Sequence, residues 1–134
     1  MRVLLVVPGW PPSNLWGQIK FKFPPLSLLT LASVTPEDAE VSIVDENIEK
    51  IDFEEGVDLV GITVMTPQAS RAYQMADQFR KRGKKVVLGG FHISHLPEEA
   101  LNHADAVVIG EGDRIWKEVI KDFQESKLKK IYKD

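Results

Sequence analysis

Residues 58–88 read DLVGITVMTPQASRAYQMADQFRKRGKKVVL and contain one complete strand–helix–strand unit. The two outer runs, Asp58–Val64 and Lys85–Leu88, are dense in Val, Ile and Leu and show little polar alternation. This pattern is typical of parallel strands that are covered on both faces. Two parallel strands need a crossover between them, so the middle of the stretch is expected to be helical.

The middle of this stretch carries the start and stop signals of a helix over Pro67–Arg82. Thr66 occupies the expected N-cap position, Pro67 the first helical position, and Gly83 follows the end. Apolar residues recur at helical spacing and define one stripe. They are Ala69, Ala72, Tyr73, Ala76 and Phe79.

Three further runs of the same kind lie outside this unit: Arg2–Val7 (RVLLVV), Val41–Val44 (VSIV) and Ala106–Ile109 (AVVI). Strands that alternate with helices predict an open α/β domain with right-handed crossovers. We therefore expect a flavodoxin-like (Rossmann-like) three-layer sandwich with a five-stranded parallel sheet of order 2-1-3-4-5.

The remaining segments predict three more helices and one tail. Helices are expected over Pro25–Val34, after Gly112-Asp113, and in a shorter piece that opens at Pro97-Glu98-Glu99. Residues 45–57 are ambiguous, because Ile48, Ile51 and Phe53 suit either one helical turn or two. The folded domain is expected to cover residues 1–126, and residues 127–134 (KLKKIYKD) are expected to be a solvated basic end or the start of a connection.

Composition excludes several classes of function. The chain has 134 residues, a net charge of −3 and no cysteine. The charge argues against a nucleic-acid partner, and the lack of cysteine excludes disulfides, thiolate metal sites and cysteine-ligated iron–sulfur clusters. No apolar run has the length of a membrane span, and the apolar start resembles no signal peptide, so a cytoplasmic location without membrane contact is expected.

In sheets of this class the ligand lies beyond the carboxyl ends of the strands. The first such end opens a long loop, residues 8–24, that carries two of the three tryptophans and is either a hydrophobic flap or a platform for a large flat ligand. The third ends in Thr63-Val64-Met65-Thr66. The fourth and fifth end in Gly89-Gly90-Phe91-His92 and Gly110-Glu111-Gly112-Asp113, where glycines permit close approach of a ligand.

Common nucleotide and metal motifs are missing from these strand ends. No G-x-G-x-x-G follows the first strand, there is no P-loop, and the third strand ends in Thr66 where a receiver domain has aspartate. Without those glycines, Asp45 is expected to be a turn or cap residue. His92 and His95 would suit a metal pair on a helix, but Pro97 favours a loop at this point, so no metal site is predicted.

Seven segments together resemble the N-terminal cobalamin-binding domain of B12-dependent radical SAM enzymes. No segment is diagnostic alone, but LGGxH, LPEEAL and VIGEG at these spacings form a specific combination. The segments are Pro24–Leu28, Val44–Glu46, Asp58–Thr63, Arg71–Tyr73, Val86–His92, Leu96–Ala100 and Ala106–Gly112.

The resemblance implies a cobalamin held against the carboxyl edge of the sheet, with its nucleotide tail near the third to fifth strands. Thr63 and Thr66 would border the tail pocket, and the loop from Gly9 to Gly17 would face the corrin. The implied cofactor-binding residues are Gly9, Trp10, Trp16, Thr63, Thr66, Gly89, Gly90, His92, Gly110, Glu111 and Gly112.

The sequence departs from related families at two places. It lacks the D-x-H-x-x-G motif that supplies the lower cobalt ligand in methionine-synthase-like domains, which leaves that ligand unassigned. It also lacks the cysteines of the radical SAM cluster, so S-adenosylmethionine and the [4Fe-4S] cluster would belong to a partner domain, in the same polypeptide or a separate subunit.

The resemblance thus predicts a cobalamin module that is not catalytic alone, whose full enzyme performs methyl transfer or related radical chemistry. Two alternatives stay open. One is an interaction or scaffold domain that has lost the cofactor, and the other is a small-molecule enzyme that uses Glu111 or His92 as a base.

Overall fold

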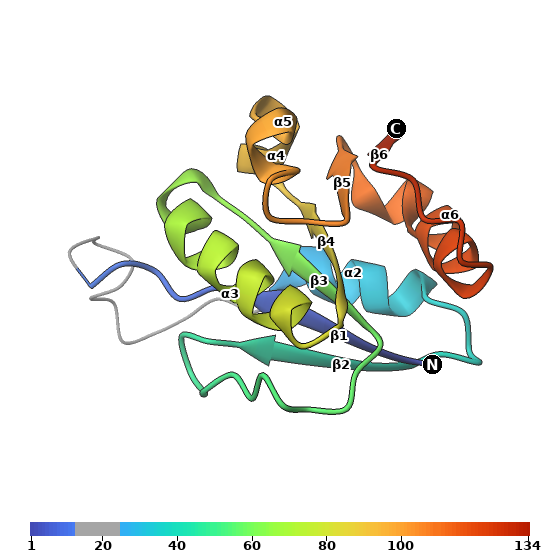
Figure 1. Cartoon of the computed structure of the whole chain (residues 1–134), viewed down its shortest axis with the longest axis horizontal. Helices are drawn as coiled ribbons and strands as arrows, with labels where there is room; N and C mark the ends of the chain where they lie inside the picture. The colour runs from blue at the N-terminus through green and yellow to red at the C-terminus, as the bar shows by residue number, and fades with distance from the viewer. Residues whose placement is uncertain (13–24) are drawn as a thin grey trace.

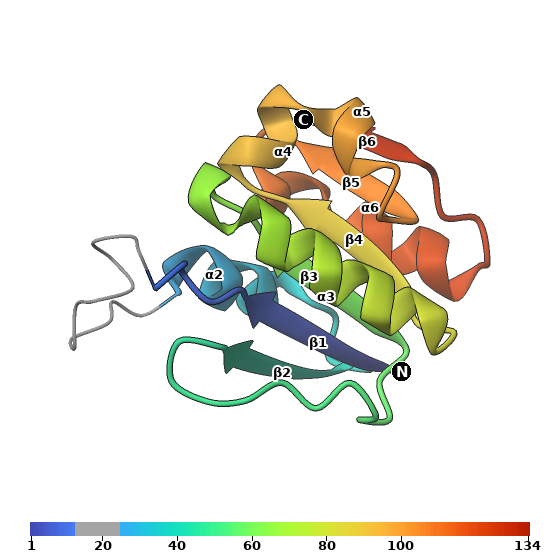
Figure 2. The same cartoon turned by 60° about the vertical axis from the view of Figure 1, so that its left-hand side comes forward.

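The computed structural model describes residues 1–12 and 25–134 and shows a six-stranded, fully parallel sheet of order β2-β1-β3-β4-β5-β6 (Figure 1). The arrowheads of β1, β2 and β4 point to the same edge (Figure 2), which collects the strand ends as expected. The strands are β1 (Arg2–Val7), β2 (Glu40–Asp45), β3 (Leu59–Thr63), β4 (Lys85–Gly89), β5 (Ala106–Ile109) and β6 (Ile131–Lys133).

The α/β class, the five predicted strands and their order are confirmed, but the expected strand count was one too low. The sixth strand lies inside the segment that we expected to be solvated. Val107 pairs with Ile131 and Val108 with Tyr132, whose side chain is only 2% exposed.

Helices cover both faces of the sheet, which confirms the three-layer arrangement. Figure 2 shows α3, α4 and α5 in front of the sheet, with α2 and α6 behind it. Each layer has its own buried apolar cluster, as parallel strands require. The helices are α2 (Leu26–Val34), the 3-10 turn η1 (Thr66–Gln68), α3 (Ala69–Lys81), α4 (Phe91–His95), α5 (Pro97–Ala100) and α6 (Gly112–Gln124).

Two local expectations were wrong. Thr66 is not the N-cap of the long helix, because residues 66–68 form the separate turn η1 and α3 begins at Ala69. His92 and His95 lie on the one-turn helix α4 and not in a loop. In the ambiguous stretch, residues 46–57 form turns and bends without a helix.

Gly61 in β3 makes space for the largest side chain of the rear layer. A Cβ at this position would lie 2.9 Å from Leu5 Cδ2 and 3.3 Å from Trp116 Cη2. The indole of Trp116 is 2% exposed, and its Nε1 donates a hydrogen bond of 2.8 Å to Thr35 Oγ1. The ring thus packs α6 against β3 at Gly61, and its hydrogen bond ties α6 to the C-terminal end of α2.

None of the helices in residues 1–12 and 25–134 is both long and apolar enough to cross a membrane.

The sixth strand can be tested at Tyr132. Its hydroxyl donates to Asp122 Oδ2 at 2.8 Å and accepts from Lys129 N at 2.9 Å. We expect Tyr132→Ala to lower the free energy of unfolding by about 3 kcal/mol, because it removes a buried aromatic ring. Ile131→Ala, at a side chain that is 46% exposed, should cost less than about 1 kcal/mol. Equal losses in urea unfolding would contradict a buried β6.

Candidate functional site

A cavity of about 540 Å³ opens at the carboxyl ends of β3, β4 and β5, on the face covered by α2 and α6. Strand ends, the two helices and the one-turn helix α4 all contribute to its lining. The lining is mostly apolar and includes several hydroxyls. It consists of Ser27, Leu28, Thr30, Leu31, Gly61, Ile62, Thr63, Val87, Gly89, Gly90, Phe91, Ser94, Val108, Gly110, Glu111, Gly112, Asp113 and Trp116.

The structure brings six of the predicted site residues together in this lining. They are Thr63, Gly89, Gly90, Gly110, Glu111 and Gly112. The sequence analysis missed the hydroxyls that α2 and α4 contribute, Ser27, Thr30 and Ser94. The helix at Pro25–Val34 was predicted, but nothing in the sequence indicated which of its faces meets the strand ends. Ser94 Oγ also accepts a hydrogen bond of 3.0 Å from Gly110 N, so it fixes the rim of the cavity.

The two glycines at the end of β4 have different reasons to be glycine. Gly90 has φ of 103°, and a Cβ there would lie 2.8 Å from Val64 N and 2.9 Å from Val64 O. The neighbouring backbone therefore excludes any side chain. Gly89 has ordinary space, because its Cβ would meet Val108 Cβ at 3.7 Å. Gly90 fixes the turn, while Gly89 leaves the cavity wall open to a ligand.

Thr66 and His92, also predicted as site residues, do not line the cavity. The imidazole of His92 is buried, with Nδ1 3.2 Å from Thr66 Oγ1 and Nε2 2.9 Å from Glu99 Oε2. The Tyr73 hydroxyl donates to the same Glu99 oxygen at 2.6 Å. Hydrogen bonds from Tyr73 and His92 lower the pKa of Glu99, whereas burial and the hydrogen bond to Glu99 raise the pKa of Tyr73.

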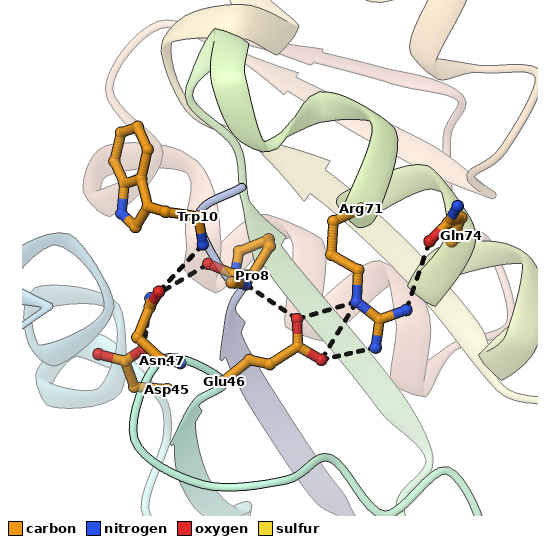
Figure 3. A network of polar contacts seen from close by, with 8 residues as sticks. Pro8, Trp10, Asp45, Glu46, Asn47, Arg71 and Gln74 are labelled. Carbon is orange, nitrogen blue, oxygen red and sulfur yellow. Dashed lines mark hydrogen bonds and ion pairs between the residues drawn. The ribbon is translucent and has the colours of Figure 1, made fainter. Parts of the chain in front are cut away.

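The backbone of Gly9 and Trp10 lies just after β1, outside the cavity lining, and is held by side chains that follow β2. Figure 3 shows Trp10 beside Asn47. Gly9 N donates to Glu46 Oε1 at 2.9 Å, and Trp10 N donates to Asn47 Oδ1 at 3.0 Å. A Cβ at Gly9 would lie 2.9 Å from the same carboxylate oxygen. The predicted site residue Trp16 lies outside the described residues.

The Glu46 carboxylate also binds Arg71 of α3, as Figure 3 shows. Arg71 Nε lies 2.9 Å from Oε1, and its terminal nitrogen lies 2.6 Å from Oε2. Burial alone would raise the pKa of Glu46, but hydrogen bonds from Arg71 and Gly9 N, together with the charge of Arg71, lower it. Sequence spacing gives no signal for this pair, because its two residues are joined only by the fold.

The side-chain amide of Gln68 also holds the backbone that follows β1. Gln68 is 2% exposed, and its Nε2 donates to Pro8 O at 2.8 Å. Its Oε1 accepts from Met65 N at 3.0 Å. The end of β1 is thus tied to the end of β3 as well as to the turn after β2.

In the part of the chain that the structure describes, no three His, Asp or Glu side chains group so that they could hold a metal ion. His95, considered with His92 as a metal pair, instead donates from Nδ1 to Phe91 O at 2.9 Å. The geometry is that of a binding site, with an apolar cavity, hydroxyls on its rim and backbone exposed at glycines.

Comparison with protein families matches residues 14–120 to the B12 binding domain. The chain belongs to the B12 binding domain family. This agrees with the resemblance in the strand-end segments, and it gives the cavity at the carboxyl edge a class of ligand to be tested.

Relatives of this B12 binding domain are longer proteins. Bacteriochlorophyllide d C-8(2)-methyltransferase of Chlorobaculum tepidum is 48% identical over 108 residues, which is 80% of this chain and 24% of the relative. The C-12(1)-methyltransferase of the same organism is 35% identical over 112 residues, 81% of this chain and 24% of the relative. An uncharacterized methyltransferase of Pyrococcus horikoshii is 33% identical over 133 residues, 90% and 29% respectively. The chain spans about a quarter of the length of these relatives.

A solved structure supports the fold alone. The N-terminal domain of a hypothetical protein from Thermotoga maritima aligns with a TM-score of 0.52 and 23% sequence identity. The alignment covers 90% of this chain and 98% of that domain.

The contrast between the two glycines gives a stability test. We expect Gly90→Ala to lower the free energy of unfolding by at least about 2 kcal/mol, because it combines a positive φ with a backbone clash. Gly89→Ala, with ordinary contact space, should change it by less than about 1 kcal/mol. Urea unfolding of both variants measures the difference. A tolerated Gly90→Ala would contradict the described turn.

The Glu46–Arg71 pair gives a pH test. We expect Glu46→Gln to destabilise the domain by about 1 kcal/mol at pH 7, because a charged hydrogen-bonded pair is lost. The pKa of Glu46 is lowered in the folded state, so its contribution is present above the ordinary value of 4.5 and is lost as pH falls through the folded value. The gap between variant and wild type should therefore shrink below pH 4.5. The exposed neighbour Glu49 provides the control Glu49→Gln, which should match wild type throughout.

Proposed function

We propose that this domain binds cobalamin noncovalently and that the cavity beside β3, β4 and β5 takes the nucleotide tail of the cofactor. The observation that carries the proposal is the cavity itself, which lies at the edge where the family implies the cofactor and is lined by six of the residues predicted for it. The corrin ring would then lie over the strand ends.

The residues that line the cavity fit the nucleotide tail of cobalamin. The tail ends in a flat aromatic base, which suits an apolar slot between a sheet and two helices. Gly61 and Gly89 present no side chain to the slot, and the wall at Trp116 is apolar. The hydroxyls of Thr30 and Thr63 can bind the polar parts of the tail.

In the full enzyme, cobalamin would supply a cobalt centre for methyl transfer or related radical chemistry, while this chain binds and orients it. Relatives named as methyltransferases, of which this chain spans about a quarter, support that context. We further propose a radical SAM partner domain. The chain contains no cysteine, so the iron–sulfur cluster and S-adenosylmethionine would be held by that partner, in the same polypeptide or in a second subunit.

The domain's own contribution would be to position the cofactor. The backbone at Pro8, Gly9 and Trp10 is held by side chains from other elements, so the corrin would meet a fixed surface there. The turn at Gly90 is held by backbone hydrogen bonds from Val64 N to Gly89 O and from His92 N to Val64 O. Both features lower the conformational cost of binding.

The proposal can be tested by retention of hydroxocobalamin on a desalting column, read by visible absorbance. We expect stoichiometric retention by the wild-type domain. Thr30→Trp should lower the affinity at least about 10-fold, because Thr30 lies on the exposed face of α2 and lines the cavity, which the indole would fill.

Ser33→Trp is the matched control, since Ser33 is an exposed hydroxyl residue one turn further along α2 and outside the cavity lining. It should bind as wild type does. If the wild-type domain retains no cobalamin, alone or with its partner domain, the proposal fails and a scaffold role becomes the better explanation. If both variants weakened binding equally, we would conclude that the tail does not bind in this cavity.

A further inference from the structure

A hydrogen-bonded chain of three side chains, here called the relay, runs from the exposed edge of the sheet into the layer of α3, α4 and α5. It joins Thr66 of η1 to His92 of α4 and His92 to Glu99 of α5. Thr66 and Glu99 are exposed, while the His92 side chain between them is only 9% exposed. A buried imidazole with both nitrogens engaged cannot rotate without losing two hydrogen bonds, so the relay has one arrangement.

The hydrogen bonds at Glu99 determine where the imidazole carries its proton. Glu99 has its pKa lowered by Tyr73 and His92, so it is a carboxylate that can only accept. His92 Nε2, at 2.9 Å from that carboxylate, must therefore be the donor. In a neutral imidazole the other nitrogen, Nδ1, then carries a lone pair.

The lone pair on Nδ1 orients the hydroxyl of Thr66. The two atoms are 3.2 Å apart, so the Thr66 hydroxyl donates its proton inward to His92. Its oxygen lone pairs are left for a partner at the exposed edge. A hydroxyl that could either donate or accept is thereby restricted to accepting.

We propose that Thr66 contacts the bound ligand as a hydrogen-bond acceptor for an amide N–H group, and that His92 and Glu99 are positioning residues that fix this polarity. The inference rests on the proposed function, because cobalamin carries primary amides around its corrin ring. Thr66 lies outside the tail cavity and just beyond the end of β3, so it would meet the periphery of the corrin and not the tail.

Groups packed around the relay hold it in place. Tyr73 of α3 donates to the same Glu99 oxygen at 2.6 Å, and its ring stacks on His103 with centroids 4.5 Å apart. His103 Nδ1 in turn lies 2.9 Å from Asp77 Oδ1. The carboxylate of Glu99 is thus fixed by α3 as well as by the imidazole, although it is exposed.

The first test needs no ligand. Long-range ¹H–¹⁵N spectra of the domain at pH 8 report which ring nitrogen of each histidine carries the proton. We expect the proton of the His92 ring on Nε2, the nitrogen that lies 2.9 Å from the Glu99 carboxylate. A proton on Nδ1, or on both nitrogens, would overturn the inference, because Thr66 would then accept from His92 and could no longer be restricted to accepting from a ligand.

The second test measures the affinity for hydroxocobalamin by titration. We expect Thr66→Val to weaken binding about 3- to 10-fold, which corresponds to the loss of one hydrogen bond. Thr66→Ser keeps the hydroxyl and should stay within about 2-fold of wild type. Unchanged affinity in Thr66→Val would overturn the inference.

The positioning role is tested at α5 with two neighbouring glutamates. Glu99→Ala should weaken binding about 2- to 3-fold and give His92 a mixture of proton positions, because the acceptor that fixes the tautomer is gone. Glu98→Ala removes the same charge from the adjacent exposed position and should match wild type. Equal behaviour of the two variants would overturn the role of Glu99.

Failure of the inference differs from failure of the proposed function. If Thr30→Trp abolishes retention while Thr66→Val binds as wild type does, cobalamin binding stands and the role of Thr66 falls. If the wild-type domain and its partner retain no cobalamin, both fall.

Discussion

The structure depends most on the way the end of β4 is locked to the end of β3. Val64 N donates to Gly89 O at 2.9 Å, and Val64 O accepts from His92 N at 3.0 Å. These two bonds bring the backbone of Gly90 so close to Val64 that only glycine fits. On one side of this junction lies the cavity, and on the other side lies the relay of Thr66, His92 and Glu99. The turn therefore determines both the position of the apolar slot and the burial of the imidazole.

The class of fold could be predicted because parallel strands that are buried on both faces need continuous Val, Ile and Leu runs. The sixth strand carries no such run. Ile131 and Lys133 are exposed and only Tyr132 is buried, so the strand depends on one ring. Its hydroxyl is bound by the nearby backbone N–H of Lys129 and by Asp122, which α6 supplies. Helix α4 was missed for a related reason. It has five residues, too few for an apolar period, and its first turn is set by Gly90.

The site was predictable only in part. The position of a strand end follows from the fold class, but the direction of a side chain in the turn after it does not. Backbone ends of parallel strands must meet at one edge, so the glycines after β4 and β5 could be placed together from their position in the sequence. The direction of a side chain in a turn is not fixed by this rule. Thr63 faces the rear cavity, whereas Thr66 and His92 belong to the front layer. The Glu46–Arg71 pair likewise joins the turn after β2 to α3 and leaves no pattern that a single sequence could show.

Three sets of hydrogen bonds hold the backbone at the carboxyl edge of the sheet. Glu46, Asn47 and Gln68 hold the backbone after β1, Val64 holds the turn after β4, and Ser94 holds the turn after β5. In each case the groups that hold the backbone come from the domain itself, so these three described segments are fixed without a ligand. A backbone that is already held favours the binding of a large cofactor with many weak peripheral contacts. Each such contact would add little to the free energy of binding if a loop first had to be ordered to make it. This is the property that the proposed function asks of the domain, which would hold and orient cobalamin while the cofactor supplies the chemistry.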